Sequence, residues 1–364
     1  MTNSFRIVVL GGDGIGPEVC DQSVRLLRQM QPHLDGVEFE LDHHSVGVGQ
    51  YKKTGEALPP SAFDACEASD AVLLGAMGLP DVRYPNGKEI APQLDLREKL
   101  QLYGGVRPIK LYHDSDTPLK GYGAGDIDFV LVRESTEGLF YGREAVADLE
   151  ADEAINEMRI TRKAAERVCR LSFEIARLRN KAKKVSLIDK ANVLSSMVYF
   201  RHIFDEVAKD FPDITADHVY VDAAALFLVR RPQDFDVMVT ENMFGDILSD
   251  LAAGIVGGMG MAPSGDIGET AAVFQPSHGS APDIAGRGLA NPIAMHLSTA
   301  MMLDWLGHGE TKRAAAALHA AVADVLSDPS RRTADMGGKL STVEITDLIS
   351  GSLDRQLQSG GVAS

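Results

Sequence analysis

The chain has 364 residues, 45% of them hydrophobic, and its 36 basic and 52 acidic side chains give a formal net charge of −16. At roughly 150 residues per domain, this length predicts two domains. The acidic balance excludes non-specific binding to nucleic acid or to an anionic membrane surface, because both are polyanionic. The net charge does not exclude a small anionic substrate, provided that a few arginines lie together at its binding site.

The number and spacing of the cysteines indicate the redox environment in which the protein works. Cys20, Cys66 and Cys169 are far apart and odd in number. This pattern favours a reducing cytoplasm over a disulfide framework. The sequence has no apolar run of about 18 residues and no signal-peptide pattern, so we expect neither a membrane segment nor secretion.

Short apolar runs alternate with amphipathic segments along the chain, which is typical of an α/β fold. The run RIVVL predicts a first strand at residues 6–10, followed by a glycine-rich turn and a helix from about Pro17. The later predicted strands are residues 71–74, 129–132, 185–188, 219–221 and 237–240. Apolar residues at helical spacing predict helices at residues 162–179, 192–209 and 311–326. The acidic stretch 143–159 is weakly periodic and predicts either an arm or a solvated surface segment.

The turn after the first strand, GGDGIGPEV, is the first candidate binding element. Backbone N–H groups at the start of a helix favour an anion such as a phosphate. The glycine spacing, however, fits neither the G-x-G-x-x-G fingerprint nor the P-loop. Taken alone, it indicates a tight structural turn.

Basic residues recur at the ends of predicted elements. Arg97 lies on a short helix, Arg107 follows a glycine pair, and Arg133 ends a strand. If they converge, three arginines form a clamp for a di- or tricarboxylate; singly, each is typical of a surface salt bridge. Lys190 directly follows a strand, where a lysine serves either as a general base or as an ordinary solvated turn residue.

A set of aspartates predicts a metal site. Asp246 and Asp250 are four residues apart, so on a helix they lie on one face. Such like charges are destabilising unless a cation lies between them, and Asp222, after an earlier strand, offers a third carboxylate. Oxygen ligands select a hard ion, Mg²⁺ or Mn²⁺. The alternative is a solvated acidic helix face.

The segment QPSHGSAPDIAGRGLANP, residues 275–292, is rich in glycine, proline and small residues, which lets backbone approach a ligand closely. His278 is placed to contact a base. Asp283 is placed to accept a hydrogen bond from a ribose 2′-hydroxyl and to repel a 2′-phosphate. A plain surface loop is the alternative.

Six motifs, GDGIGPE, LREKLQLYGGVRP, VRESTEG, DKANVL, FGDILSD and HGSAPDIAGRGLANP, occur in the order typical of one family. From Ile7 to beyond Asn291, the chain resembles the β-decarboxylating hydroxyacid dehydrogenases, which include the 3-isopropylmalate, isocitrate, homoisocitrate, D-malate and tartrate dehydrogenases. The resemblance implies the α/β, two-domain isopropylmalate dehydrogenase-like fold, with a mixed sheet and an active cleft between the domains. Residues 1–103 with 257–364 would form the cofactor-binding terminal domain, and residues 104–256 the central domain for substrate, metal and dimerisation.

The resemblance also implies roles for individual residues. The substrate residues would be Arg97, Arg107 and Arg133 for its carboxylates, with Gln93 and Leu94 facing the C3 substituent. The divalent metal, Mg²⁺ or Mn²⁺, would be chelated by Asp222, Asp246 and Asp250. The NAD-binding residues would be Ile15, His278, Gly279, Ser280, Ala281, Asp283, Ile284 and Asn291.

Lys190 would assist deprotonation of the C2 hydroxyl of a small anionic 2-hydroxy acid. In the family, the equivalents of Lys190 and Asp222 reach across a dimer interface, so the catalytic residues would come from both chains of a homodimer. After hydride loss at C2, departure of the β-carboxylate as CO₂ requires protonation at C3, for which relatives use a tyrosine. In this sequence, Phe140 stands at the position of that tyrosine, and Tyr141 is the next residue. Either Tyr141 or water donates the proton, or simple oxidation dominates.

Two further departures concern the substrate side. Gln93 stands where isopropylmalate enzymes have a leucine, and a buried glutamine facing two methyl groups loses hydrogen bonds on the order of 1–3 kcal/mol. A polar C3 substituent, or none, is therefore as compatible as isopropyl. Gln275 stands where many relatives carry Glu. The sequence predicts an NAD- and metal-dependent oxidative decarboxylation of a 3-substituted D-malate, with a tartrate or D-malate dehydrogenase and a non-catalytic ligand-binding paralogue as alternatives.

Overall fold

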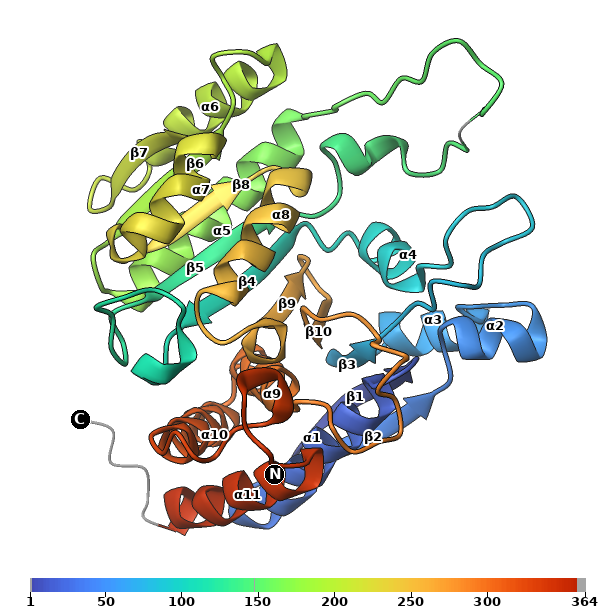
Figure 1. The fold of residues 1–364 in the computed structure, drawn as a ribbon, viewed down its shortest axis with the longest axis vertical. Coiled ribbons are helices and arrows are strands. Elements are labelled where there is room, and N and C mark those ends of the chain that lie inside the picture. The colour runs from blue at the N-terminus through green and yellow to red at the C-terminus, as the bar shows by residue number, and fades with distance from the viewer. Residues whose placement is uncertain (1, 147, 359–364) are drawn as a thin grey trace.

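The computed structural model describes residues 2–146 and 148–358. In that part of the chain, ten strands form one continuous sheet in the order β2-β1-β3-β10-β9-β4-β5-β8-β6-β7 (Figure 1). The strands are β1 Asn3–Gly12, β2 Val37–His44, β3 Ala71–Ala76, β4 Gly104–Lys110, β5 Asp128–Glu134, β6 Lys184–Asp189, β7 Thr215–Tyr220, β8 Val237–Thr240, β9 Pro263–Ile267 and β10 Ala272–Pro276.

The sheet is mixed, as predicted. β2, β1, β3 and β10 are parallel neighbours at one end, and β5, β8, β6 and β7 are parallel neighbours at the other. The antiparallel pairs β10–β9, β9–β4 and β4–β5 join these two ends. The chain crosses this junction more than once, which explains why no linker separates the halves in the sequence.

Helices cover both faces of the sheet in each half. The α-helices are α1 Gly16–Met30, α2 Val48–Thr54, α3 Pro60–Glu67, α4 Pro92–Lys99, α5 Arg162–Arg179, α6 Ser195–Ala208, α7 Val221–Arg230, α8 Asn242–Gly254, α9 Ile293–Trp305, α10 Gly309–Leu326 and α11 Thr342–Gln358. In the central half, α5 and α6 pack on one face while α7 and α8 pack on the other. The alternation of β5 produces this arrangement, because Val130 and Val132 face the first pair and Phe129 and Leu131 face the second.

The buried hydrophobic residues separate along the same line. Two clusters have buried members only between residues 109 and 256, whereas the other three draw theirs from residues before 103 and after 260. This separation agrees with the predicted division into a terminal and a central domain, although the boundaries themselves stay a prediction.

Most predicted elements are present, with shifted ends. The run at 219–221 is the end of β7, and Val221 already begins α7. The helix predicted at 192–209 spans Ser195–Ala208, because residues 190–194 form turns. The described residues of 143–159 lie outside the helices and strands and project from the body between the short helix η3, Leu139–Gly142, and α5 (Figure 1). In the described residues, every helix is too short or too polar to cross a lipid bilayer.

Candidate active site

A cavity of about 250 Å³ lies where the two halves of the sheet meet. Its walls come from α4, β4, β5, α8, and β10 with the loop that follows it. The lining side chains that carry charge or hydrogen-bonding groups are Gln93, Arg97, Arg107, Arg133, Asp246, Ser264, Gln275, Ser277 and His278. The three predicted substrate arginines therefore converge, although they lie at three separate places in the sequence.

All three arginines are buried, with exposed fractions of 8% for Arg97, 6% for Arg107 and 2% for Arg133. Arg133 ends β5, and its Nε donates to Asn242 Oδ1 at 2.8 Å while Nη1 donates to Asp246 Oδ1. Arg107 lies within β4, and its Nη1 donates to the hydroxyl of Ser249 on α8. Helix α8 thus fixes two of the three guanidinium groups.

Burial and mutual repulsion raise the free energy of this cationic cluster. Burial lowers the pKa of Arg107, and the neighbouring charge of Arg97 adds to the effect. Burial, with the charges of Arg107 and Arg97, lowers the pKa of Arg133 to about 9. A cavity lined by three guanidinium groups favours an anionic occupant.

The predicted metal carboxylates Asp246 and Asp250 share one face of α8 at the edge of this cavity. Arg107 lies 3.9 Å from Asp246 and 4.0 Å from Asp250. Burial raises the pKa of Asp250, and the charge of Asp246 raises it further while Arg107 opposes the change. Two repelling carboxylates beside an anion-binding cavity form a donor set that suits a hard dication.

Lys190 and Asp222 lie together but away from this cavity. Lys190 follows β6, Asp222 is in the first turn of α7, and Lys190 Nζ donates to Asp222 Oδ1 at 2.6 Å. This hydrogen bond lowers the pKa of Asp222. Neither residue lines the cavity of its own chain, and among the described residues no three potential metal ligands gather. One chain therefore does not bring Asp222 to Asp246 and Asp250.

Several buried polar atoms at the cavity wall have no hydrogen-bond partner among residues 2–146 and 148–358. They are Gln93 Oε1, Arg107 Nε, Ser264 Oγ, Ser277 Oγ and His278 Nε2. A buried polar group without a hydrogen bond destabilises the folded protein by about 1–3 kcal/mol, so this wall favours an occupant that offers hydrogen bonds. Leu94 lies beside Gln93 and contributes apolar surface to the same wall.

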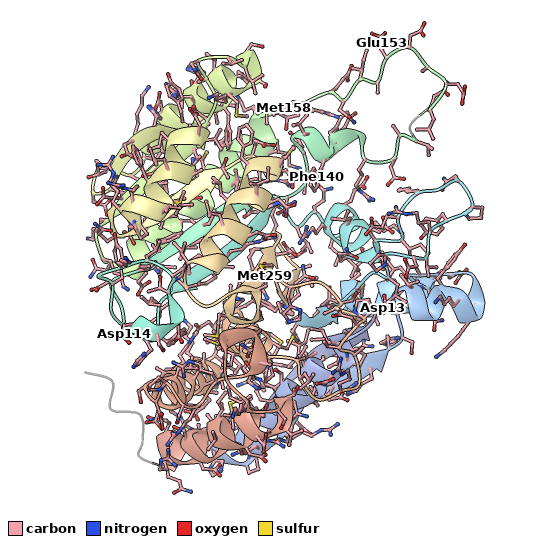
Figure 2. All side chains as sticks on the ribbon, in the orientation of Figure 1. Asp13, Asp114, Phe140, Glu153, Met158 and Met259 are labelled. Atoms are coloured by element: carbon pink, nitrogen blue, oxygen red, sulfur yellow. The ribbon has the colours of Figure 1, made fainter. Side chains whose placement is uncertain are left out.

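Phe140 and Tyr141 differ in the cavities that they line: Phe140 lines both the arginine cavity and a neighbouring one, whereas Tyr141 lines the neighbouring one alone. Phe140 lies between α4 and α8 and lines the arginine cavity (Figure 2), with its ring centroid 5.1 Å from the guanidinium carbon of Arg133. Tyr141 does not line this cavity: its ring packs against Arg159 at 4.5 Å.

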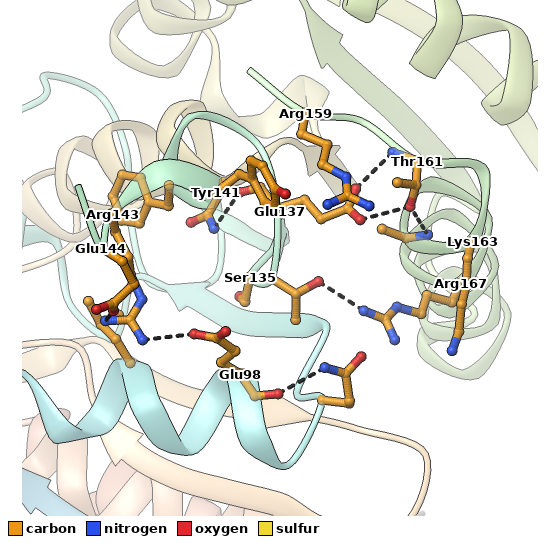
Figure 3. Close-up of a pocket in the computed structure, with 16 residues that line it drawn as sticks. Glu98, Ser135, Glu137, Tyr141, Arg143, Glu144, Arg159, Thr161, Lys163 and Arg167 are labelled. Carbon is orange, nitrogen blue, oxygen red and sulfur yellow. Dashed lines mark hydrogen bonds and ion pairs between the residues drawn. The ribbon is translucent and has the colours of Figure 1, made fainter. Parts of the chain in front are cut away.

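Tyr141 instead lines a neighbouring cavity of about 260 Å³ (Figure 3). Four basic residues of that cavity, Arg143, Arg159, Lys163 and Arg167, alternate with the carboxylates of Glu98, Glu137 and Glu144. The charged side chains that line the neighbouring cavity therefore leave one positive charge in excess, whereas those that line the arginine cavity leave two.

The predicted cofactor residues gather around the glycine-rich turn. Ile15 N donates to Ser280 O at 2.8 Å. A Cβ on Gly14 would lie 1.9 Å from that carbonyl oxygen, so only glycine permits this contact. His278 and Gly279 continue into the arginine cavity, and burial lowers the pKa of His278. The loop after β10 therefore links the glycine turn to the anion-binding cavity.

The remaining loop residues differ in exposure. Ala281 has a φ of +36°, and Ile284 is half-buried. Asp283 is exposed, and among the described residues its carboxylate has neither a hydrogen bond nor an ion pair. Asn291, in contrast, is buried: its Oδ1 accepts from Ile293 N at 3.1 Å and its Nδ2 donates to Asp335 at 3.1 Å.

Some residues of the site were not predicted from the sequence. Asn242, which holds Arg133, precedes Asp246 by four residues, and extending the helical spacing by one turn would have found it. Asp13, in the glycine turn, accepts hydrogen bonds from the backbone of Val48, Gly49 and Gly78. Asp266, on β9, accepts one from Arg97 of α4, and no sequence pattern signals that contact.

Comparison with known proteins agrees with this architecture. A sequence model of the family described as isocitrate/isopropylmalate dehydrogenase matches residues 6–349. The 3-isopropylmalate dehydrogenase of Aquifex aeolicus is 42% identical, over 96% of this chain and 98% of the relative. The homoisocitrate dehydrogenase of Methanocaldococcus jannaschii is 40% identical, over 97% and 99%.

A crystal structure of isocitrate dehydrogenase from Methylococcus capsulatus superposes with a TM-score of 0.85 at 36% identity, covering 96% of this chain and 99% of that one. Sequence and fold agree over almost the whole chain. The resemblance inferred from six motifs is thereby confirmed. The chain belongs to the isocitrate/isopropylmalate dehydrogenase family and is a β-decarboxylating dehydrogenase.

Proposed function

We propose that this enzyme converts a 3-substituted D-malate and NAD⁺ into a 2-keto acid, CO₂ and NADH, with Mg²⁺ or Mn²⁺ as the metal. The observation that carries the proposal is the convergence of Arg97, Arg107 and Arg133 on one buried cavity whose edge bears Asp246. A cluster of buried guanidinium groups suits a substrate with more than one carboxylate. The relatives named above act on such acids.

We assign substrate positioning to this chain's own groups. The arginines hold the carboxylates, and Asp246 and Asp250, with Asp222 of the partner subunit, would hold the dication. When bound, the dication polarises the oxygens of the hydroxy acid and NAD⁺ accepts hydride from C2. The partner subunit's Lys190 receives the proton of the C2 hydroxyl. Loss of CO₂ from C3 leaves an electron pair there, which takes up a proton.

For that last proton we favour water, one of the two donors considered from the sequence. Phe140 lines the arginine cavity and has no exchangeable proton. Tyr141 packs against Arg159 and faces the neighbouring cavity, so its hydroxyl is poorly placed for C3.

We place NAD⁺ along the glycine turn and the loop after β10, with the nicotinamide end toward His278. The exposed carboxylate of Asp283, which has no partner in the part of the chain that the structure describes, can accept from the ribose hydroxyls and repels a 2′-phosphate. Replacing Asp283 by Lys should therefore lower the KM for NADP⁺ and raise that for NAD⁺. An unchanged preference would exclude this placement.

We further propose a homodimer. Exposed apolar side chains from α7 and α8, Leu226, Val229, Met243 and Ile247, lie on the same half of the molecule as Lys190 and Asp222. A second copy on this surface would bury it and would bring Lys190 and Asp222 to the partner's cavity. The three free, buried cysteines favour a cytoplasmic location.

The two candidate substrate classes differ in the substituent on C3. Gln93 Oε1 is buried with no partner in the described structure, which favours a hydroxyl or an unsubstituted C3 beside it. This supports a tartrate or D-malate dehydrogenase as the second candidate. A non-catalytic paralogue is set aside, because the family assignment makes the chain an enzyme.

The test is an NADH-absorbance and thermal-shift panel with Mn²⁺ and 3-isopropylmalate, D-malate, tartrate and isocitrate. We expect turnover of at least one malate with NAD⁺, dependent on Mn²⁺. Clear ligand stabilisation without turnover of any of them would contradict the proposed reaction.

A further inference from the structure

Behind Arg97 lies a buried carboxylate that does not line the cavity. Asp266, on β9, is 1% exposed. Its Oδ2 accepts from Arg97 Nε at 3.0 Å and from Gln275 Nε2 at 2.7 Å. Its Oδ1 is buried without a partner among the described residues. Both Arg97 and Gln275 line the cavity, so Asp266 connects two of its wall residues from behind.

This contact determines which edge of the Arg97 guanidinium faces the cavity. In the described structure, Nε is the only nitrogen of Arg97 with a hydrogen-bond partner. A guanidinium binds a carboxylate through two parallel N–H groups, either along the Nε side or at the terminal pair. Because Asp266 occupies Nε, the terminal pair is the edge left for a substrate carboxylate.

Asp266 also supplies negative charge where the arginines are most crowded. Its charge opposes the burial and the Arg97 charge that lower the pKa of Arg107. It likewise opposes, with Asp246, the larger lowering of the pKa of Arg133. Three buried cations without such a counter-charge would repel one another and shift apart.

Gln275 matches Asp266 chemically. The amide donates to Oδ2, whereas a glutamate at position 275 would put a second carboxylate in the same short contact, and one of the two would have to bind a proton. Gln275 is the departure noted in the sequence, where many relatives carry Glu. In this chain, the carboxylate at that junction comes from β9 and the amide from β10.

We propose that Asp266 is a positioning residue for substrate binding: it holds Arg97 with its terminal edge toward the substrate carboxylate, and Gln275 holds Asp266. The inference rests on the proposed function, since it requires Arg97 to bind a substrate carboxylate. It also identifies positions 266 and 275 as a carboxylate–amide pair whose members are exchangeable.

The test is a charge swap in the full-length enzyme. Asp266→Asn should raise the KM for the malate that the unaltered enzyme turns over by about tenfold or more, with the KM for NAD⁺ unchanged. The double variant Asp266→Asn/Gln275→Glu moves the carboxylate back to β10 and should restore that KM to within about threefold of the unaltered value.

Asp236→Asn is the matched control. Asp236 is 3% exposed and accepts a hydrogen bond from Arg179 Nε at 2.9 Å. The substitution Asp236→Asn therefore removes a comparable ion pair, near the opposite ends of β5 and β8. We expect it to lower the melting temperature as Asp266→Asn does, without changing the KM for the malate.

Two results would overturn the inference while leaving the proposed function intact. One is a malate KM within about twofold of normal in folded Asp266→Asn. The other is a charge-swapped variant that recovers the melting temperature but not the KM, which would make Asp266 merely structural. If the unaltered enzyme neither binds nor turns over any malate, the proposed function fails and this inference fails with it.

Discussion

The ring of Phe140 lies 5.1 Å from the guanidinium carbon of Arg133, so a side chain without an exchangeable proton lines the arginine cavity. The phenol of the next residue, Tyr141, packs against Arg159 in the neighbouring cavity. In the proposed reaction, the position from which a tyrosine would protonate C3 is therefore occupied by a phenylalanine.

We therefore expect Tyr141→Phe to retain kcat within about threefold, because its hydroxyl is outside the arginine cavity. Phe140→Tyr should raise the rate of CO₂ release by at least about tenfold, since a positioned general acid contributes about 10²–10⁴-fold. CO₂ and NADH measured in one assay give both rates. A hundred-fold loss in Tyr141→Phe would identify Tyr141 as the donor after all.

Gly245 controls the position of Arg133. A Cβ at Gly245 would lie 2.7 Å from both Cβ and Cγ of Arg133, so Gly245→Ala should displace the arginine and raise the malate KM by about tenfold or more. Gly254→Ala is the control on the same helix, because a Cβ there has no neighbour within 4 Å. It should leave the KM unchanged and stabilise α8 by up to about 1 kcal/mol. Equal KM values for both variants would refute this role of Gly245.

Shared sites predict complementation between inactive variants. Lys190→Ala and Asp246→Asn should each abolish turnover as homodimers. Refolded together in equal amounts, they should recover about a quarter of normal activity, because half of the dimers are mixed and each mixed dimer has one intact site.

The pairing of Lys190→Ala with Asp222→Asn is the control for that experiment. Both residues would be donated by the same partner, so every site in a mixed dimer lacks one of them and no activity should return. Recovery in this control, or none in the first mixture, would contradict a site built from two chains.

His296 predicts how stability depends on pH. It is fully buried between Ser23 Oγ, 2.8 Å from Nδ1, and Thr346 Oγ1, 3.2 Å from Nε2, and burial lowers its pKa to about 3. Between about pH 6.5 and pH 3 the unfolded chain binds a proton that the folded chain does not, so stability falls as pH falls.

From about pH 7.5 to pH 5 this histidine should cost the folded state about 2 kcal/mol. Denaturant unfolding at the two pH values measures the loss. The variant His296→Gln should be less stable at neutral pH but should lose less on acidification. An equal loss in both proteins would rule out His296 as the source.

The features that the sequence predicted are mostly those set by the periodicity of apolar residues and by the order of the motifs along the chain. The alternation of strands and helices, the presence of β5 and β6, and the shared face of Asp246 and Asp250 follow from local spacing. The convergence of Arg97, Arg107 and Arg133 required the family resemblance, because they come from different elements. Contacts between elements distant in the sequence, such as Arg97 of α4 with Asp266 of β9, depend on tertiary packing, which no local pattern encodes. The same holds for the contacts of Phe140 with Arg133 and of Tyr141 with Arg159.

The most direct test of the account is calorimetric titration of Mn²⁺ into the unaltered enzyme and into Asp246→Asn/Asp250→Asn. We expect about one Mn²⁺ per chain in the former and none in the latter. Asp324→Asn/Asp328→Asn, which removes two acids at the same spacing near the end of α10, should bind as the unaltered enzyme does. Undiminished Mn²⁺ binding after loss of Asp246 and Asp250 would contradict the proposed metal site and the chemistry that depends on it.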